Sequence, residues 1–247
     1  MGEQMQIGCQ MAFNDFTSPQ YIAEAAQFVD EFGFDEFWVP EHVMFFPSYE
    51  SKYPYSEDVR IGGEPRSLLD PFSALTFVAA HTQSIRLGTG ICLVPQRNPV
   101  YTAKVAADLD FLSGGRFDLG VGIGWLKEEF EALGVSYEKR GARFDDYVAG
   151  MRKVWSEGVV EHESDFISWH GFKSYPLPIQ DPFPVVMGGV KGKIFERTAQ
   201  LGNGWFAPTG DPSELQGHLE SLKMECDKVG RDLSEIEITC MWPGQGG

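Results

Sequence analysis

The sequence lacks long hydrophobic runs, and this absence excludes one class of protein at once. No apolar stretch approaches the ~20 residues that a membrane-spanning helix requires. The first ten residues, MGEQMQIGCQ, also lack the basic and apolar segments of a secretory signal. We therefore expect a cytoplasmic protein that has no membrane partner.

Cysteine is scarce too, and its spacing argues against a metal site. The chain has 4 cysteines, and none of them forms a C-x-x-C pair. Because zinc sites commonly draw their ligands from such pairs, we expect no bound metal. Three of the four (Cys9, Cys92 and Cys240) lie in strand-like runs, which is typical of reduced cysteines in a protein core.

The third deficit is positive charge. The chain has 20 Lys and Arg residues against 36 Asp and Glu residues, a formal net charge of -16. Binding to nucleic acid needs a basic face, so we expect no nucleic acid partner. An anionic cofactor is still compatible with this charge, because backbone N–H groups and one or two lysines can hold a phosphate locally.

The chain is long enough for a substantial core. Its 247 residues, 43% of them hydrophobic, fit one large α/β barrel or two small domains. No linker and no low-complexity segment divides the sequence. We therefore expect residues 1–247 to form a single domain.

The stretch from Ile85 to Trp125 has the pattern of a complete βαβ unit. An apolar run (85–94) is followed by a helical pattern (99–112), a Ser-Gly-Gly-Arg break and a second apolar run (117–123). Both runs end in glycines, which let the backbone approach a ligand closely. Ligands of α/β folds bind at this end of the strands, so the stretch predicts a fold and a binding face together.

Similar units recur along the chain. Alternating strand and helix patterns predict a parallel sheet, and glycines that follow the strands favour a (β/α)8 barrel of the TIM type. A complete barrel needs eight strands. Either one strand is missed, the barrel is incomplete at its C-terminus, or a partner closes it. The seven strand candidates are residues 6–13, 36–40, 85–94, 117–123, 184–190, 204–208 and 236–242.

Two further features belong to the expected barrel. The mixed aromatic and charged segment 159–180 predicts a hairpin laid against the barrel end. The long segment 44–69, rich in Tyr, Pro and Gly, predicts a functional loop. We expect the substrate to enter between these two segments, and we expect a homodimer.

Five motifs, in the same order along the chain as in the family, resemble those of bacterial luciferase-like monooxygenases. They are WVPEHV, LGTGICLVPQRNPVYTAK, LDFLSGGRFDLGVGIGWLKEEFEALG, PVVMGG and GNGWF. More narrowly, the chain is similar to the branch that uses the deazaflavin coenzyme F420. The resemblance implies a TIM-type barrel whose mouth holds the cofactor ring, and an oxidoreductase that transfers a hydride between F420 and a small organic substrate.

The resemblance also places a non-proline cis peptide bond behind the cofactor ring. The matching bond is Gly90–Ile91, so it assigns both residues to cofactor binding. Taken alone, Gly90 would more simply indicate close packing of a helix. Gly124 and Trp125, which end the fourth strand candidate, are assigned to the cofactor in the same way.

Trp125 is also a departure from one group of relatives. The sugar-phosphate dehydrogenases of the family carry a catalytic glutamate at this position. Glu128 and Glu129 lie a turn further on and are not assumed to replace it. The departure argues against a sugar-phosphate reaction and predicts that Trp125 packs against the ring, the substrate or the long loop.

Glu41 and His42 directly follow the second strand candidate. In the F420-dependent dehydrogenases that the chain resembles, an acid–histidine pair stands at this place. An imidazole has an unperturbed pKa near ~6.5, so it can take the proton of a carbinol oxygen as a hydride leaves the carbon. Both residues are therefore predicted to be catalytic. The alternative is that His42 is a structural loop residue.

The segment Gly188-Gly189-Val190-Lys191 follows the fifth strand candidate and precedes a helix. Backbone N–H groups at such a junction can form an anion nest, and TIM-type barrels commonly hold a phosphate near the later strands. The resemblance implies that the cofactor phosphate binds here. On spacing alone, the segment could equally be a plain turn.

Two rival functions remain open at this level. One is an FMN-dependent luciferase-like monooxygenase, and the other is a flavin-binding protein without catalysis. Both would use the same barrel mouth as the F420-dependent oxidoreductase, with a small-molecule substrate as the partner of either enzyme.

Overall fold

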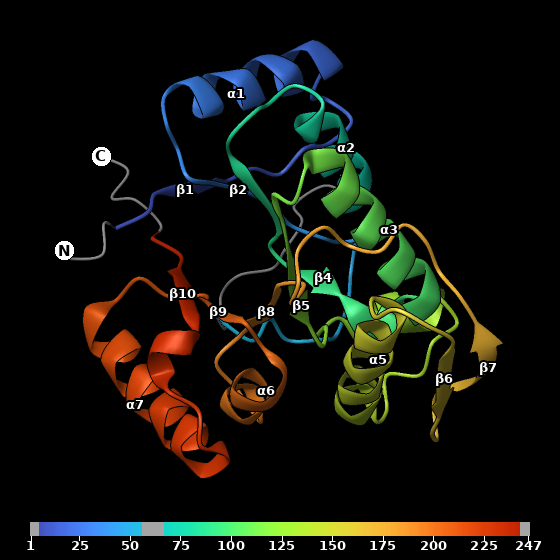
Figure 1. The fold of residues 1–247 in the computed structure, drawn as a ribbon. Coiled ribbons are helices and arrows are strands. Elements are labelled where there is room, and N and C mark those ends of the chain that lie inside the picture. The colour runs from blue at the N-terminus through green and yellow to red at the C-terminus, as the bar shows by residue number, and fades with distance from the viewer. Residues whose placement is uncertain (1–4, 56–66, 243–247) are drawn as a thin grey trace.

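A computed structural model describes residues 5–55 and 67–242 of the chain (Figure 1). One parallel sheet with the strand order β1-β2-β3-β5-β8-β9-β10 forms its centre, and the short β4 pairs with β5. Each of the seven principal strands lies within one of the seven strand candidates of the sequence. The bounds of these strands and of β4 are β1 (Gly8–Gln10), β2 (Glu36–Val39), β3 (Arg86–Thr89), β4 (Cys92–Leu93), β5 (Phe117–Gly122), β8 (Val185–Gly188), β9 (Gly204–Ala207) and β10 (Glu237–Cys240).

The residues at the start of several helices explain why those helices begin there. At four of them a capping side chain accepts a backbone N–H of the first turn, and a proline follows at the first helical positions; these caps are Ser18, Asp70, Asn98 and Asp211. The helices are α1 (Pro19–Glu31), α2 (Pro71–Ala79), α3 (Pro99–Ser113), α4 (Lys127–Ala132), α5 (Arg140–Val154), α6 (Ile194–Leu201) and α7 (Pro212–Val229), with 3-10 turns η1 (Val94–Gln96) and η2 (Leu233–Glu235).

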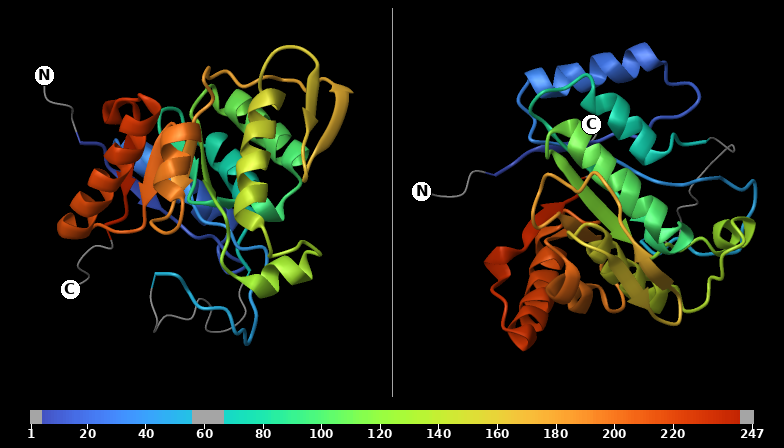
Figure 2. Two further views of the ribbon diagram at one scale, coloured as in Figure 1. Left: turned by 90° about the horizontal axis from the view of Figure 1, so that it is seen from below. Right: turned by 45° about the vertical axis from the view of Figure 1, so that its right-hand side comes forward.

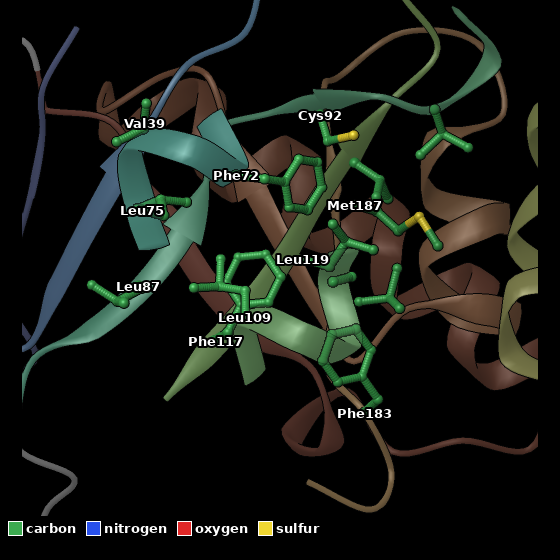
Figure 3. Packing of buried hydrophobic residues seen from close by; sticks show 14 of the residues in the cluster. Val39, Phe72, Leu75, Leu87, Cys92, Leu109, Phe117, Leu119, Phe183 and Met187 are labelled. Atoms are coloured by element: carbon green, nitrogen blue, oxygen red, sulfur yellow. The ribbon is translucent and has the colours of Figure 1, made fainter. Parts of the chain in front are cut away.

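The sheet is curled, with helices on its outer side (Figures 1 and 2). The main core lies between the outer face of the sheet and these helices. Figure 3 shows Leu87, Phe117 and Leu119 from the strands packed with Leu75 and Leu109 from helices α2 and α3. Successive side chains of a strand point to opposite faces, so the neighbours of these residues in the sequence line the inside of the curl.

Glycines on the inner face of the sheet make room for the large ring of Trp38. A Cβ atom added at Gly88 would overlap the Trp38 side chain, and one at Gly120 would overlap the carbonyl oxygen of Thr89. The Trp38 ring lies edge-on to the Phe206 ring, with 4.9 Å between centroids. Strands β2 and β9 therefore meet through side chains across the interior, below the strand ends.

The fold is the (β/α)8 barrel type with one strand missing from the described residues. The hydrogen-bonded path runs from β1 to β10, and no pairing joins these two strands in the part of the chain that the structure describes. The result is a half-barrel, which agrees with the expected incomplete barrel. The open edge also exposes Cys240 on β10, so the prediction that it is a core residue is wrong, although all four cysteines are free as expected.

The apolar run 85–94 is not one strand. Strand β3 ends at Thr89, the Gly90–Ile91 peptide bond is cis, and β4 and η1 follow. The cis bond is the one that the resemblance implies. Of the long segment 44–69, residues 56–66 lie outside the described residues.

The segment 159–180 forms a hairpin, but its predicted place was wrong. Strands β6 (Val160–Glu163) and β7 (Ser168–Phe172) pair antiparallel and lie beside α5 (Figure 1). Gly150 of α5 permits this packing, because an ideal Cβ there would lie 2.9 Å from Ile167. The hairpin therefore covers an outer helix, and none of its residues lines the cavity at the strand ends beside which we expected it.

Charged side chains meet inside the curl at the opposite end of the strands. Arg86 Nε lies 2.8 Å from Asp118 Oδ2, and the Trp38 indole N–H donates to Glu36 Oε2 over 2.8 Å. Burial raises the pKa of Glu36 to about 7; the indole hydrogen bond opposes this shift, while Glu237 and Asp118 add to it. The influence of Glu237 on Glu36 indicates that the first residues of β2 and β10 lie near each other inside the curl.

Glu36 gives the fold a testable pH dependence. Its pKa is raised above the ordinary 4.5, so its stabilising contribution is complete below about pH 4.5 and is lost as the pH rises to about 7. We expect the unfolding temperature to fall over this window by at least ~2 °C. Glu36→Gln should remove most of that fall, and Glu237→Gln should reduce it. Thermal unfolding followed by circular dichroism checks this, and equal slopes in all three proteins would contradict it.

Candidate functional site

A cavity of about 450 Å³ opens at the C-terminal ends of the strands. Every strand of the sheet path contributes a residue at or just beyond its end, from Gln10 after β1 to Met241 after β10. The structure brings together all ten residues that the sequence assigned to the site. They are Glu41, His42, Gly90, Ile91, Gly124, Trp125, Gly188, Gly189, Val190 and Lys191.

Glycines form one wall of this cavity. Gly122 and Gly188 lie against the Ile91 side chain so closely that a Cβ atom at either position would overlap it; at Gly188 that atom would lie 2.7 Å from Ile91 Cδ1. The carbonyl oxygen of Gly90 accepts a hydrogen bond from Gln10 Nε2 over 2.7 Å. The bulge after β3 is thus packed from two sides, and larger residues at these glycines would displace Ile91.

His42 is held by a buried carboxylate. His42 Nδ1 lies 3.2 Å from Glu129 Oε2, and the Glu129 side chain is 0% exposed. The other carboxylate oxygen accepts the backbone N–H of Val43 over 2.7 Å. Gln96 Nε2 donates to Oε2 over 3.1 Å. Glu129 of α4 therefore joins the loop after β2 to η1.

The ionisation state of Glu129 determines which ring nitrogen of a neutral His42 carries the proton. Burial raises the pKa of Glu129, but hydrogen bonds from His42, Gln96 and Val43 lower it below its usual value overall. An ionised carboxylate can only accept, so a neutral His42 ring must carry its proton on Nδ1. Nε2, which has no hydrogen bond within the described residues, is then left with a free lone pair.

Glu41 is positioned differently from His42. Its carboxylate accepts the Leu93 N–H over 2.5 Å and Arg97 Nε over 2.6 Å, and the residue is only 5% exposed. Arg97 continues to Asp70, the cap of α2. Attraction to Glu41 and Asp70 outweighs desolvation and raises the pKa of Arg97. Glu41 therefore fixes the segment from β4 to η1, and both of its carboxylate oxygens accept hydrogen bonds from the protein.

Aromatic rings surround Trp125. Its ring lies edge-on to His42 at 5.9 Å, to Tyr49 at 5.7 Å and to Tyr53 at 5.4 Å between centroids. Tyr53 in turn meets Tyr55 at 5.4 Å. We call Tyr53, Tyr55 and Trp125, all of which line the cavity, the aromatic wall. Trp125 thus contacts the long loop, which is one of the places that the sequence predicted for it.

The segment after β8 curves around the cavity. Gly189 has a φ of 119°, which favours glycine, and its carbonyl oxygen accepts the Trp205 indole N–H over 2.8 Å. Lys191 donates to the carbonyl oxygen of Pro54 in the long loop. Lys193 does not line the cavity and pairs with Glu196 at 3.3 Å.

The cavity is positive within an acidic protein. Arg140, Lys191 and Arg197 line it, and the carboxylate that lines it, Glu41, is already paired with Arg97. Arg197 is itself paired with Asp145 at 2.5 Å. Local charge at the strand ends is therefore opposite in sign to the net charge of -16.

Comparison with known proteins adds to this geometry. The family described as luciferase-like monooxygenase matches residues 4–243 of the chain. The chain belongs to the luciferase-like monooxygenase family. An uncharacterized protein of Mycobacterium tuberculosis is 32% identical over 221 residues, which are 88% of this chain and 78% of that protein.

Solved structures show that this luciferase-like protein has the family fold. The monooxygenase RslO1 from Streptomyces bottropensis has a TM-score of 0.76 at 28% identity, over 96% of this chain and 70% of that chain. An F420-dependent secondary alcohol dehydrogenase in complex with an F420-acetone adduct has a TM-score of 0.78 at 22% identity, over 95% and 68% of the two chains. The solved structures that share this fold thus include an F420-dependent dehydrogenase and a monooxygenase.

Two features are absent from the described residues of this luciferase-like chain. Among residues 5–55 and 67–242, no group of three or more potential ligands is placed to hold a metal ion. Within the same residues, no helix is both long and apolar enough to cross a membrane. A single chain does not test the homodimer, which stays a prediction.

Sequence reasoning missed Glu129. It lies 87 residues from His42 in the sequence, in the motif LKEEF, and nothing in its spacing points to a histidine. One signal was available: two adjacent glutamates at the start of a short helix that directly follows a strand end. The structure separates their roles, because Glu128 binds the backbone of Glu50 and Ser51 instead.

Proposed function

We propose that this luciferase-like protein is an oxidoreductase that transfers a hydride between coenzyme F420 and a small organic alcohol or ketone. The observation that carries the proposal is the His42–Glu129 pair at the mouth of a glycine-walled cavity. A histidine whose Nδ1 is bound by a buried carboxylate is set up to exchange a proton at Nε2.

The cavity fits a flat, anionic cofactor. Gly122 and Gly188 have no side chains, so the Ile91 side chain packs directly against the backbone there. The face that these three residues form is suited to support a planar ring. Backbone N–H groups around Gly189 and the ammonium group of Lys191 would hold a phosphate. The positive lining of the cavity supports an anionic ligand in a chain that repels anions elsewhere.

The residues of the chain supply proton handling and orientation. When bound, F420 supplies the two-electron acceptor for the hydride that leaves the substrate carbon. His42 Nε2 takes the hydroxyl proton as the carbonyl forms, and Glu129 stabilises the resulting imidazolium. In the reverse direction His42 returns the proton to the oxygen. Glu41 contributes by holding the β4–η1 segment behind the site rather than by touching the substrate.

An FMN-dependent monooxygenase is the second candidate. The similarity to the monooxygenase RslO1, at 28% identity, favours it. The glycine wall and the phosphate-binding segment would suit FMN as well. A flavin-binding protein without catalysis is less well supported, because it would give the buried His42–Glu129 pair no chemical task.

Parallel assays of turnover separate the candidates. One measures loss of F420 absorbance without oxygen across a panel of alcohols, and the other measures oxygen uptake with reduced FMN and the same panel. We expect F420 reduction that depends on the alcohol. Oxygen uptake with reduced FMN alone would support the monooxygenase, and binding without turnover in either assay would support a carrier protein.

Lys191 provides a direct test of the phosphate site. Lys191→Glu should weaken F420 binding about tenfold or more, since a hydrogen bond to a charged group contributes ~1.5 kcal/mol. Lys193→Glu is the matched control, because it makes the same charge change two residues away and outside the cavity. Fluorescence titration compares the two. Equal weakening in both variants would show a general charge effect and reject the site.

A further inference from the structure

The carboxylates nearest His42 are all engaged by the protein. Glu41 binds Leu93 and Arg97, and Glu129 binds His42 itself. Glu128 accepts the Ser51 hydroxyl over 2.6 Å and the Glu50 N–H over 2.7 Å. The carboxylates around this end of the cavity are therefore already hydrogen-bonded within the protein, whereas His42 Nε2 has no partner among the described residues.

Aromatic rings border the space next to His42. The ring centroids of Trp125 and Tyr53 of the aromatic wall lie 5.4 Å apart, and Trp125 lies edge-on to His42. Burial raises the pKa of Tyr53, and it raises that of Tyr55 to about 12, so both phenols stay neutral at physiological pH. The wall thus presents flat, uncharged faces beside one proton-accepting nitrogen.

We propose that the substrates are neutral secondary alcohols, and the matching ketones, that carry an aryl or other flat apolar group. The proposal rests on the proposed function and names the substrate class of the same site. The apolar group would stack on the aromatic wall while the single hydroxyl meets His42 Nε2. Polyols and sugar phosphates are disfavoured, because their further hydroxyl groups would lose water against the apolar faces of the aromatic wall.

Oxidation of such an alcohol is balanced by groups already named. The carbinol C–H bond would break with its electron pair, and F420 held at the strand ends would supply the acceptor for that hydride. The O–H proton goes to His42 Nε2, and the carbon–oxygen double bond of the ketone forms. No other oxidant is needed, and reduction of the ketone is the exact reverse.

Ligand-observed NMR tests the proposal without requiring turnover. The probes are acetophenone, 1-phenylethanol and glucose 6-phosphate, each added to wild-type protein saturated with F420, so that the proposed phosphate-binding segment is already occupied. We expect both aryl compounds to bind and glucose 6-phosphate not to. Trp125→Ala should weaken aryl binding about tenfold or more, and Trp125→Phe, which keeps an aromatic face, should retain most of it.

The possible results separate this proposal from the function on which it rests. Tighter binding of glucose 6-phosphate than of acetophenone, or aryl binding that Trp125→Ala leaves unchanged, would overturn the substrate class. Aryl binding through Trp125 without any F420 reduction by 1-phenylethanol would support the binding site and reject the proposed function. If Trp125→Ala does not fold, Trp125→Glu provides the same comparison and should also abolish aryl binding.

Discussion

Replacing His42 with alanine should lower kcat for F420-linked turnover by about 100-fold or more, the range that general acid–base catalysis supplies. His42 Nε2 is the unbound ring nitrogen of the pair with Glu129, and alanine leaves no group to take the hydroxyl proton. F420 affinity should change little, because the phosphate segment and the glycine wall remain. Steady-state kinetics together with fluorescence titration measure the two effects separately.

His170→Ala is the matched control for that experiment. This histidine lies on strand β7, its side chain is 79% exposed, and it does not line the cavity. It should leave kcat unchanged. Full activity in His42→Ala would remove His42 from the mechanism, and equal losses in both variants would point to a general effect on folding.

Replacing Glu129 with glutamine should reduce kcat roughly 10-fold to 100-fold, which is part of the contribution that His42 makes. Glutamine keeps the shape of the side chain but is neutral, and its amide can donate as well as accept. The ring of His42 would then lose the charge that stabilises its imidazolium and the acceptor that keeps the proton on Nδ1. KM should move much less than kcat.

A spectroscopic measurement distinguishes this positioning role from loss of structure. Nitrogen-15 NMR of histidine-labelled protein should show His42 as the Nδ1–H tautomer in the wild type and a mixture in Glu129→Gln. Glu128→Gln removes the neighbouring carboxylate, which holds Glu50 and Ser51 rather than His42. It should leave both tautomer and kcat unchanged. An unchanged tautomer in Glu129→Gln would contradict the role of Glu129.

Much of the site could be predicted because its parts are local in sequence. Each predicted residue directly follows a strand, and the C-terminal ends of parallel strands meet at one edge. Gly122 and Gly188 mark places where another segment packs closely against the backbone. Both glycines belong to short glycine-containing motifs that can be recognised in the sequence. Helix starts were equally local, since a cap and a proline stand side by side at α1, α2, α3 and α7.

The remaining features depend on contacts between distant segments. Glu41 looks catalytic beside His42, yet Arg97, 56 residues away, occupies its carboxylate. The composition of segment 159–180 predicted a hairpin against the barrel end, but Gly150 lets the hairpin pack on α5 instead. The sequence alone also does not reveal the charged cluster inside the sheet, because Glu36 and Glu237 come from strands near opposite ends of the chain.

The central claim about this protein is that a planar redox cofactor binds at the glycine-lined strand ends. Parallel fluorescence titrations of the purified protein with F420 and with FMN test this most directly. We expect saturable, stoichiometric binding of F420 that is tighter than binding of FMN. Failure of both molecules to bind would contradict the assignment of the cavity, whatever the outcome of the mutational experiments.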